Sequence, residues 1–115
     1  FVRTWNGTSW TQVVSNLSAS SDPGTHAQLS GFAIDGLGRQ VLAWNEQQGT
    51  EYLAYVYRHN GTQFVPLGGA AIDAVPGGDS GQVRIAIDGC NQVYMVQDEQ
   101  NGKGGSRDLY FWVFR

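Results

Sequence analysis

A chain of 115 residues is long enough for one domain with its own hydrophobic core, and a hydrophobic content of 41% argues against a disordered protein. Seven Lys and Arg against ten Asp and Glu give a formal net charge of −3, which argues against a nucleic-acid partner, and no apolar run approaches the roughly 18 residues of a membrane-spanning helix. The 16 glycines and the 12% of aromatic residues are typical of a β-protein with many tight turns.

The chain begins with FVRTWNGTSWTQV, in which Asn6-Gly7 stands between two stretches that suit β-strands. Asn-Gly is the strongest two-residue signal for a β-hairpin, because both residue types tolerate the positive φ angles of the turn. Residues 1–14 therefore predict the end of one strand, a tight turn and a further strand.

Residues 29–68 predict a four-stranded antiparallel sheet whose strands follow one another along the chain. The strands read QLSGFAID, RQVLAW, YLAYVYR and TQFVPLG, and their aromatic and β-branched residues suit a pleated surface. A turn at 35–38, a polar loop at 45–50 and an Asn-Gly turn at 60–61 are expected to connect them.

The glycine-containing segment VPGGDSG at 75–81 predicts a loop, and residues 82–115 then predict three more strands. These strands read QVRIAID, QVYMVQ and LYFWVFR, with a turn at 88–91 and a polar loop at 98–106 between them. No segment has a sustained helical period. The second group of strands therefore matches the first three strands of the group before it.

The two groups share short motifs at a spacing close to 53 residues. The matching segments are AIDG at 33–36 and 86–89, Asn-Gly-Thr at 6–8 and 60–62, Gln-Val at 40–41 and 92–93, and YVYR at 55–58 with WVFR at 112–115. This alignment predicts that the second turn lacks one residue and that Val96 takes the place of Trp44. Four-stranded units of this period indicate the blades of an all-β propeller. A solenoid is the competing fold, although its repeats are usually shorter or contain helices.

The order of the predicted strands is that of a permuted propeller with two blades per chain. Residues 29–68 would form blade one, residues 82–115 the first three strands of blade two, and residues 1–14 an outer strand donated to a neighbouring blade. Two blades cannot close a ring, so we expect identical chains to assemble head to tail. Three copies with six blades are expected, and four copies with eight blades are the alternative. The chain does not begin with Met, so a piece excised from a larger propeller is a further alternative.

The stretches WNGTSWTQV, FAIDGLGRQVLAWNE and VYRHNGTQFVPLG resemble bacterial β-propeller repeats, and the resemblance covers essentially the whole chain. It implies propeller blades. Small two-blade lectins that form six-bladed, sugar-binding trimers are similar in predicted architecture. No sugar-contacting residue of those lectins is matched, so the resemblance assigns no ligand site.

The predicted loops at 45–50 and 98–106 would lie on one face of the ring and contain most of the candidate ligand-binding residues. These residues are Trp44, Asn45, Glu46, Gln97, Asp98 and Glu99. A sugar site needs a flat apolar surface for the C–H face of the sugar, and planar amides and carboxylates for its hydroxyls. Binding pockets in general combine apolar walls with a few polar groups. The sequence therefore predicts non-catalytic, lectin-like binding of saccharides without a cofactor.

Asp35 and Asp88 precede glycines in the predicted turns, where we expect each carboxylate to accept backbone N–H groups. Neither histidine has the spacing of a zinc ligand, and no Gly-x-Ser-x-Gly motif is present. The sequence therefore predicts no metal site and no enzyme activity.

Two other functions stay open at this point. A structural or protein-interaction propeller would be favoured by a Trp44 buried between blades and by a ring face without a pocket. A glycosidase would need a pair of carboxylates in a cleft, and the sequence offers Glu46, Asp98 and Glu99 for that pair.

Overall fold

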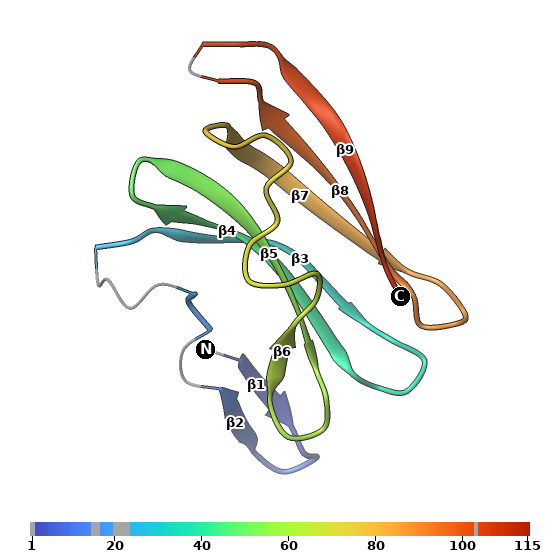
Figure 1. Cartoon of the computed structure of the whole chain (residues 1–115). Coiled ribbons are helices and arrows are strands. Elements are labelled where there is room, and N and C mark those ends of the chain that lie inside the picture. Colours follow the sequence, from blue (N-terminus) through green and yellow to red (C-terminus); the bar gives the residue numbers. More distant parts are fainter. Residues whose placement is uncertain (1, 15–16, 20–23, 103) are drawn as a thin grey trace.

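The structure is a computed structural model that describes residues 2–14, 17–19, 24–102 and 104–115, so Phe1 of the predicted segment 1–14 lies outside the described residues. The described residues contain nine β-strands and no helix (Figure 1). The strands are β1 Val2–Trp5, β2 Trp10–Val14, β3 Ala27–Ile34, β4 Gln40–Gln48, β5 Glu51–His59, β6 Phe64–Pro66, β7 Asp79–Ile87, β8 Val93–Gln100 and β9 Arg107–Phe114. This part of the chain accordingly offers no helix that is long and apolar enough to cross a membrane.

The strands form three antiparallel sheets in which neighbours along the chain are also neighbours in the sheet. β1 pairs with β2 in an N-terminal hairpin, β3 to β6 form a four-stranded sheet, and β7 to β9 form a three-stranded sheet. The prediction of an all-β chain built from antiparallel strands is confirmed. In Figure 1 the three sheets follow one another across the molecule, with the N-terminal hairpin and the three-stranded sheet at opposite ends.

Two strands continue into segments whose polar sequence predicts loops. β4 ends at Gln48, so the predicted loop at 45–50 is reduced to a turn at 49–50. β8 ends at Gln100, so the predicted loop at 98–106 is reduced to 101–106. The prediction was wrong because polar runs usually mark exposed connections, whereas here Asn45, Glu46 and Glu99 are buried and hydrogen-bonded.

The turns that follow β3 and β7 are closed by the same hydrogen bonds. Each aspartate Oδ1 accepts the backbone N–H groups two and four residues further along, at 3.0 and 2.9 Å for Asp35 and at 2.8 and 2.9 Å for Asp88. The expected turn role of both carboxylates is confirmed. Gly38 and Asn91 occupy the same position of the turn, with φ of 77° and 64° in the left-handed region.

The matching turns correct the alignment of the two groups of strands. Both turns have the same length, so the second one does not lack a residue. The spacing then stays at 53 residues along β4 and β8, which places Gln97, not Val96, in the position of Trp44.

The Asp35 carboxylate is buried and is also bound by arginine. Arg39 Nε donates to Asp35 Oδ2 at 2.7 Å, and Arg58 Nη1 lies 3.8 Å from the same oxygen. Burial acts to raise the pKa of Asp35, but the N–H groups of the turn and the Arg39 guanidinium outweigh burial and hold the pKa below its ordinary value of 3.8. A carboxylate with a lowered pKa stabilises the fold above the ordinary pKa, and that stabilisation is lost as the pH falls through the lowered value.

Asp35→Asn is therefore expected to lower the free energy of unfolding by about 1–3 kcal/mol near neutral pH, because two arginines lose their charged partner. The difference from the unchanged protein should shrink in acid, where Asp35 itself is protonated. Urea unfolding across the acid range measures both effects. Asp108→Asn, at an exposed position of β9, is the matched control. A loss of stability that is equally large in acid would contradict the role given to the Asp35 charge.

The main hydrophobic core lies between the four-stranded and three-stranded sheets. Its buried members are Val41, Ala43, Ala54, Val56, Ile72, Val83, Val93, Met95 and Phe114. The edge strands β3 and β7 approach closely beside it, because Gly31 has no side chain. A Cβ at Gly31 would lie 2.9 Å from Ile85 Cγ1, closer than real Cβ contacts.

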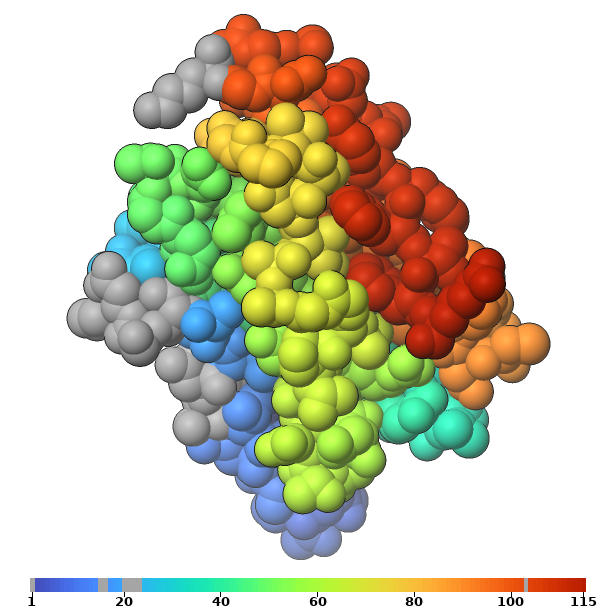
Figure 2. Space-filling view, in the orientation of Figure 1, coloured from blue at the N-terminus to red at the C-terminus, as the bar shows by residue number. Residues whose placement is uncertain are grey.

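The segment between β6 and β7 runs along β5 and closes one side of this core. The N–H groups of Leu67 and Ile72 donate to the carbonyl oxygens of Val56 and Ala54, each at 2.8 Å. Figure 2 shows this segment in yellow, between the green four-stranded sheet and the red end of the chain. The segment therefore helps to hold the two larger sheets together.

A smaller core covers the other face of the four-stranded sheet. Leu42, Trp44 and Tyr55 form it, and Val2 and Leu17 pack against it from the N-terminal side. The turn of the N-terminal hairpin has the hydrogen bonds of the β5–β6 turn, since the side-chain oxygens of Asn6 and Asn60 each accept the N–H groups two and three residues further on. The N-terminal hairpin thus resembles the last two strands of a four-stranded sheet.

The outer face of the three-stranded sheet is apolar and has no covering within the described residues. Val96 pairs with Phe111 as Ala43 pairs with Val56, so this face corresponds to the buried face of the four-stranded sheet. The same pairing sets the spacing of β5 and β9 at 55 residues, where the sequence alignment predicts 57. The exposed apolar residues of this outer face are Val96, Leu109, Phe111 and Val113.

A second exposed apolar row lies on β3, at the opposite end of the stack of sheets. It consists of Leu29, Phe32 and Ile34. Leu29 pairs with Trp44 and Phe32 pairs with Leu42, so this β3 row continues the face that carries the smaller core. The corresponding residues of β7 are packed on the four-stranded sheet.

Candidate functional site

Glu46 is a buried acceptor that holds the chain segment before the four-stranded sheet. Its side chain accepts hydrogen bonds from Ser18 Oγ at 2.5 Å, from Ala19 N–H at 2.9 Å and from Trp44 Nε1 at 2.9 Å. Trp44 is only 4% exposed and stacks on Tyr55. Trp44 and Glu46 therefore stabilise the fold and present little surface to a ligand.

Glu99 takes the same role 53 residues later. Its side chain accepts the N–H groups of Ala74 at 3.1 Å and Val75 at 2.7 Å, together with Gln97 Nε2 at 2.6 Å. Glu99 and Gln97 are fully buried. Burial raises the pKa of Glu99, and the nearby Asp73 carboxyl acts in the same direction. In both places a glutamate on the second strand of a sheet binds the loop that leads into that sheet.

Asn45 connects the two larger sheets. Its side-chain oxygen accepts Ser30 Oγ at 3.1 Å, and its Nδ2 donates to the carbonyl oxygen of Ser80 at 3.2 Å. The first contact lies at a bulge of β3, where the pairing between Leu29 and Gly31 shifts.

Asp98 occupies the corresponding position of β8. Its carboxylate accepts the Gln82 N–H at a bulge of β7 and forms an ion pair with Arg107. The structure thus does not bring the six predicted ligand-binding residues together as one exposed patch. Asn45 and Asp98 line one cleft, and Gln97 and Asp98 line a second, smaller hollow on the three-stranded sheet.

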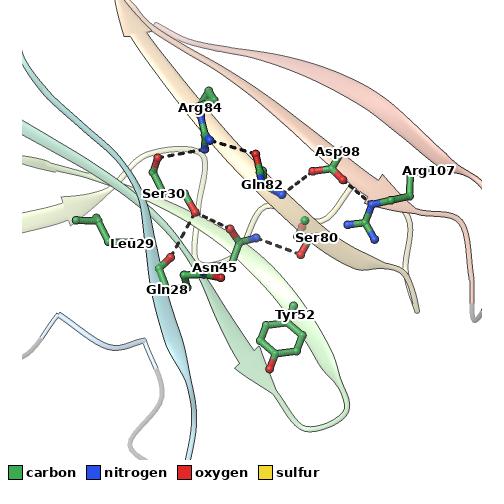
Figure 3. A pocket seen from close by; sticks show the side chains of 11 residues that line it. Gln28, Leu29, Ser30, Asn45, Tyr52, Ser80, Gln82, Arg84, Asp98 and Arg107 are labelled. Carbon is green, nitrogen blue, oxygen red and sulfur yellow. Dashed lines mark hydrogen bonds and ion pairs between the residues drawn. The ribbon is translucent and has the colours of Figure 1, made fainter.

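This cleft has a volume of about 500 Å³ and lies between the four-stranded and three-stranded sheets (Figure 3). Besides Asn45 and Asp98 it is lined by polar side chains of β3, β5, β7 and β9, among them Gln28, Tyr52, Ser80, Gln82, Arg84 and Arg107. Figure 3 shows Arg84 and Tyr52 on opposite sides of the cleft. The lining therefore combines an aromatic ring with amides, guanidinium groups and a carboxylate.

Ser80 brings an unpaired hydroxyl to the lining of the cleft. The residue is 6% exposed, and its Oγ has no hydrogen-bond partner among the described residues. An unpaired buried polar group costs about 1–3 kcal/mol. The oxygen itself is covered in this structure, so a ligand hydroxyl would bind it, and remove that cost, after the Ser80 side chain rotates toward the cleft.

The carboxylates considered for glycoside hydrolysis do not form a pair in this cleft. Asp98 lines it, whereas Glu46 and Glu99 are engaged by backbone and side-chain donors. Within the described ranges, no three His, Cys, Asp or Glu side chains are grouped to hold a metal ion.

Comparisons of the chain with protein-family models, with curated proteins and with solved structures find no significant match. The chemistry of the cleft and the exposed sheet faces therefore carry the functional argument.

Sequence reasoning missed Tyr52, Ser80, Arg84 and Arg107 as lining residues. A signal for two of them lies in the differences between the two groups of strands. Arg84 stands where the first group has Gly31, and Arg107 stands where it has Tyr52. A cleft-lining position at which the two groups differ in charge is a candidate for binding.

Proposed function

We propose that the chain is a non-catalytic, lectin-like β-propeller module that binds saccharides in the cleft between its two larger sheets. The observation that carries this proposal is the buried, unpaired Ser80 hydroxyl in a cleft lined by polar side chains. Sugar hydroxyls both donate and accept hydrogen bonds, so they suit a lining of hydroxyl, amide and guanidinium groups. The Tyr52 ring supplies an apolar surface for the C–H face of a sugar.

Ser80→Ala is expected to weaken saccharide binding by about tenfold, since the ligand loses one hydrogen bond in a buried place. The fold should be at least as stable as that of the unchanged protein, because alanine removes a buried hydroxyl that has no hydrogen-bond partner among the described residues. Calorimetry with a panel of monosaccharides at millimolar concentration measures the effect. Ser106→Ala, at an exposed site beyond the cleft, is the matched control. Absence of binding to every sugar by the intact protein would contradict the proposed function.

The partner that we propose for the two exposed apolar faces is a second copy of the chain. The outer face of the three-stranded sheet corresponds to the face of the four-stranded sheet that is buried against β7 and β8. We therefore expect the outer face to be covered by a surface that resembles the covering face of β7 and β8. On a second copy, the face that carries the β3 row is such a surface. The contact is heterologous, so it repeats until a ring closes. Three copies would close a six-bladed propeller, with the N-terminal hairpin of each copy beside the three-stranded sheet of its neighbour.

A structural or protein-interaction propeller is the second candidate function. The burial of Trp44 favours it, because Trp44 does not offer its ring to a sugar. Assembly of the chain without affinity for any sugar of the panel would select this candidate.

A further inference from the structure

The cleft carries an arginine whose charge is not matched by a carboxylate of the described chain. Asp98 is paired with Arg107, and Asp35 is paired with Arg39 and Arg58. Arg84 lines the cleft and has no described carboxylate within ion-pair distance. The side chains that line the cleft therefore carry one positive charge in excess, in a chain whose formal net charge is −3. The Asp79 carboxylate lies outside this lining and accepts the Tyr52 N–H at 2.9 Å.

Hydrogen bonds with neutral acceptors orient the Arg84 side chain. Its Nη1 donates to the carbonyl oxygens of Val83 at 2.9 Å and Ser30 at 3.5 Å, and its Nη2 donates to Gln82 Oε1 at 3.1 Å. A guanidinium group has five N–H donors, so two of them have no partner in these bonds. Figure 3 shows the bonds that join Arg84 to Ser30 and Gln82 at the rim of the cleft.

We propose that the ligand of this cleft is an acidic saccharide whose carboxylate binds Arg84. A planar carboxylate matches the geometry of two guanidinium N–H donors and forms a stronger hydrogen bond than a neutral hydroxyl. The sugar hydroxyls would then extend toward Ser80 and Tyr52, which line the same cleft. This inference rests on the proposed function and narrows its ligand class.

A carboxylate ligand is favoured over a neutral sugar because Arg84 has no carboxylate of the described chain within ion-pair distance. A neutral hydroxyl at Arg84 would leave the excess charge of the cleft uncompensated, whereas a carboxylate neutralises it. Long-range attraction does not explain this preference for a carboxylate, since the net charge of −3 repels anions at a distance. The preference for a carboxylate therefore depends on Arg84 itself. It should weaken as added salt screens the ion pair between Arg84 and the ligand carboxylate.

The test uses pairs of monosaccharides that differ at one carbon, namely glucuronate with glucose, galacturonate with galactose, and mannuronate with mannose. Calorimetry at low salt is expected to show at least one uronate binding about tenfold more tightly than its neutral partner. Arg84→Gln should abolish this preference, so that each uronate binds no more tightly than its neutral partner. Arg115→Gln makes the same charge change at the far end of β9 and should have no effect.

The possible results distinguish a failure of the acidic-ligand proposal from a failure of the proposed function. Equal binding of both members of every pair, or a preference that survives Arg84→Gln, would overturn the acidic ligand while saccharide binding stands. Absence of binding to all six sugars would overturn both. Arg84→Lys keeps the charge but not the paired donors, so a partial preference in that variant would support recognition by the guanidinium group.

Discussion

Glu99→Ala is expected to lower the free energy of unfolding by about 3 kcal/mol, because three buried or partly buried donors lose their acceptor. The N–H groups of Ala74 and Val75 and the amide of Gln97 all bind this one carboxylate. The loop that they anchor leads directly into β7, so its release also loosens the edge of the three-stranded sheet. Urea unfolding of the variant and of the unchanged protein, near neutral pH, measures the loss.

Glu99→Gln separates the shape of the side chain from its charge. The amide keeps one acceptor and the same size, so it should recover part of the stability that alanine loses. Because the pKa of Glu99 is raised, the stabilisation linked to its protonation is present below the ordinary pKa and is lost as the pH rises through the raised value. The Gln variant should lack this pH dependence. Asp108→Ala, which removes an exposed carboxylate on the neighbouring strand, is the control, and a loss as large as that of Glu99→Ala there would contradict the role of Glu99.

Phe111→Lys is expected to reduce the native mass from that of the proposed three-chain assembly to that of one chain, because it places a charge in the middle of the outer face. Phe111 is 66% exposed and Leu109 is 77% exposed, so neither residue contributes much to the fold of the isolated chain. Burial of such side chains against a second copy would contribute about 1.5–3 kcal/mol each. Light scattering over a range of concentrations gives the native mass, and circular dichroism tests whether the variant remains folded.

A matched control for the assembly is Leu37→Lys, which introduces the same charge at an exposed turn residue outside both apolar faces. This variant should keep the mass of the assembly. A folded single chain in the unchanged protein at all concentrations would contradict self-association through these faces. Phe32→Lys, on the β3 row, tests the opposing surface and should have the effect of Phe111→Lys.

The strands and turns could be predicted from the sequence because local chemistry determines them. The asparagines of the two Asn-Gly turns and the aspartates of the two other turns accept hydrogen bonds from N–H groups at most four residues away, so a short motif suffices to predict each turn. The abundance of aromatic and β-branched residues indicated β5 and β9 for the same reason. The predicted all-β architecture followed from these signals.

The site could not be predicted in the same way because its polar residues depend on long-range contacts. Glu46 is hydrogen-bonded to Ser18, and Glu99 to Val75, which are 28 and 24 residues away along the chain. A strand whose polar side chains bind such distant partners has the same composition as an exposed loop, so composition alone does not distinguish the two. The burial of Trp44 follows from its packing on Tyr55 and from its hydrogen bond to Glu46. No sequence motif predicts these two contacts.

Gly31 and Arg84 stand at equivalent positions, yet one has no side chain and the other has a long charged one. The absence of a side chain at Gly31 lets Ile85 of the adjoining sheet approach closely. A neighbouring copy seated beside Arg84 would meet a guanidinium at the equivalent point and would have to stand further away. Tight and wide junctions would then alternate around a closed assembly of three chains. Its rotational symmetry would be threefold rather than sixfold, and its valence for a polyvalent glycan would be three.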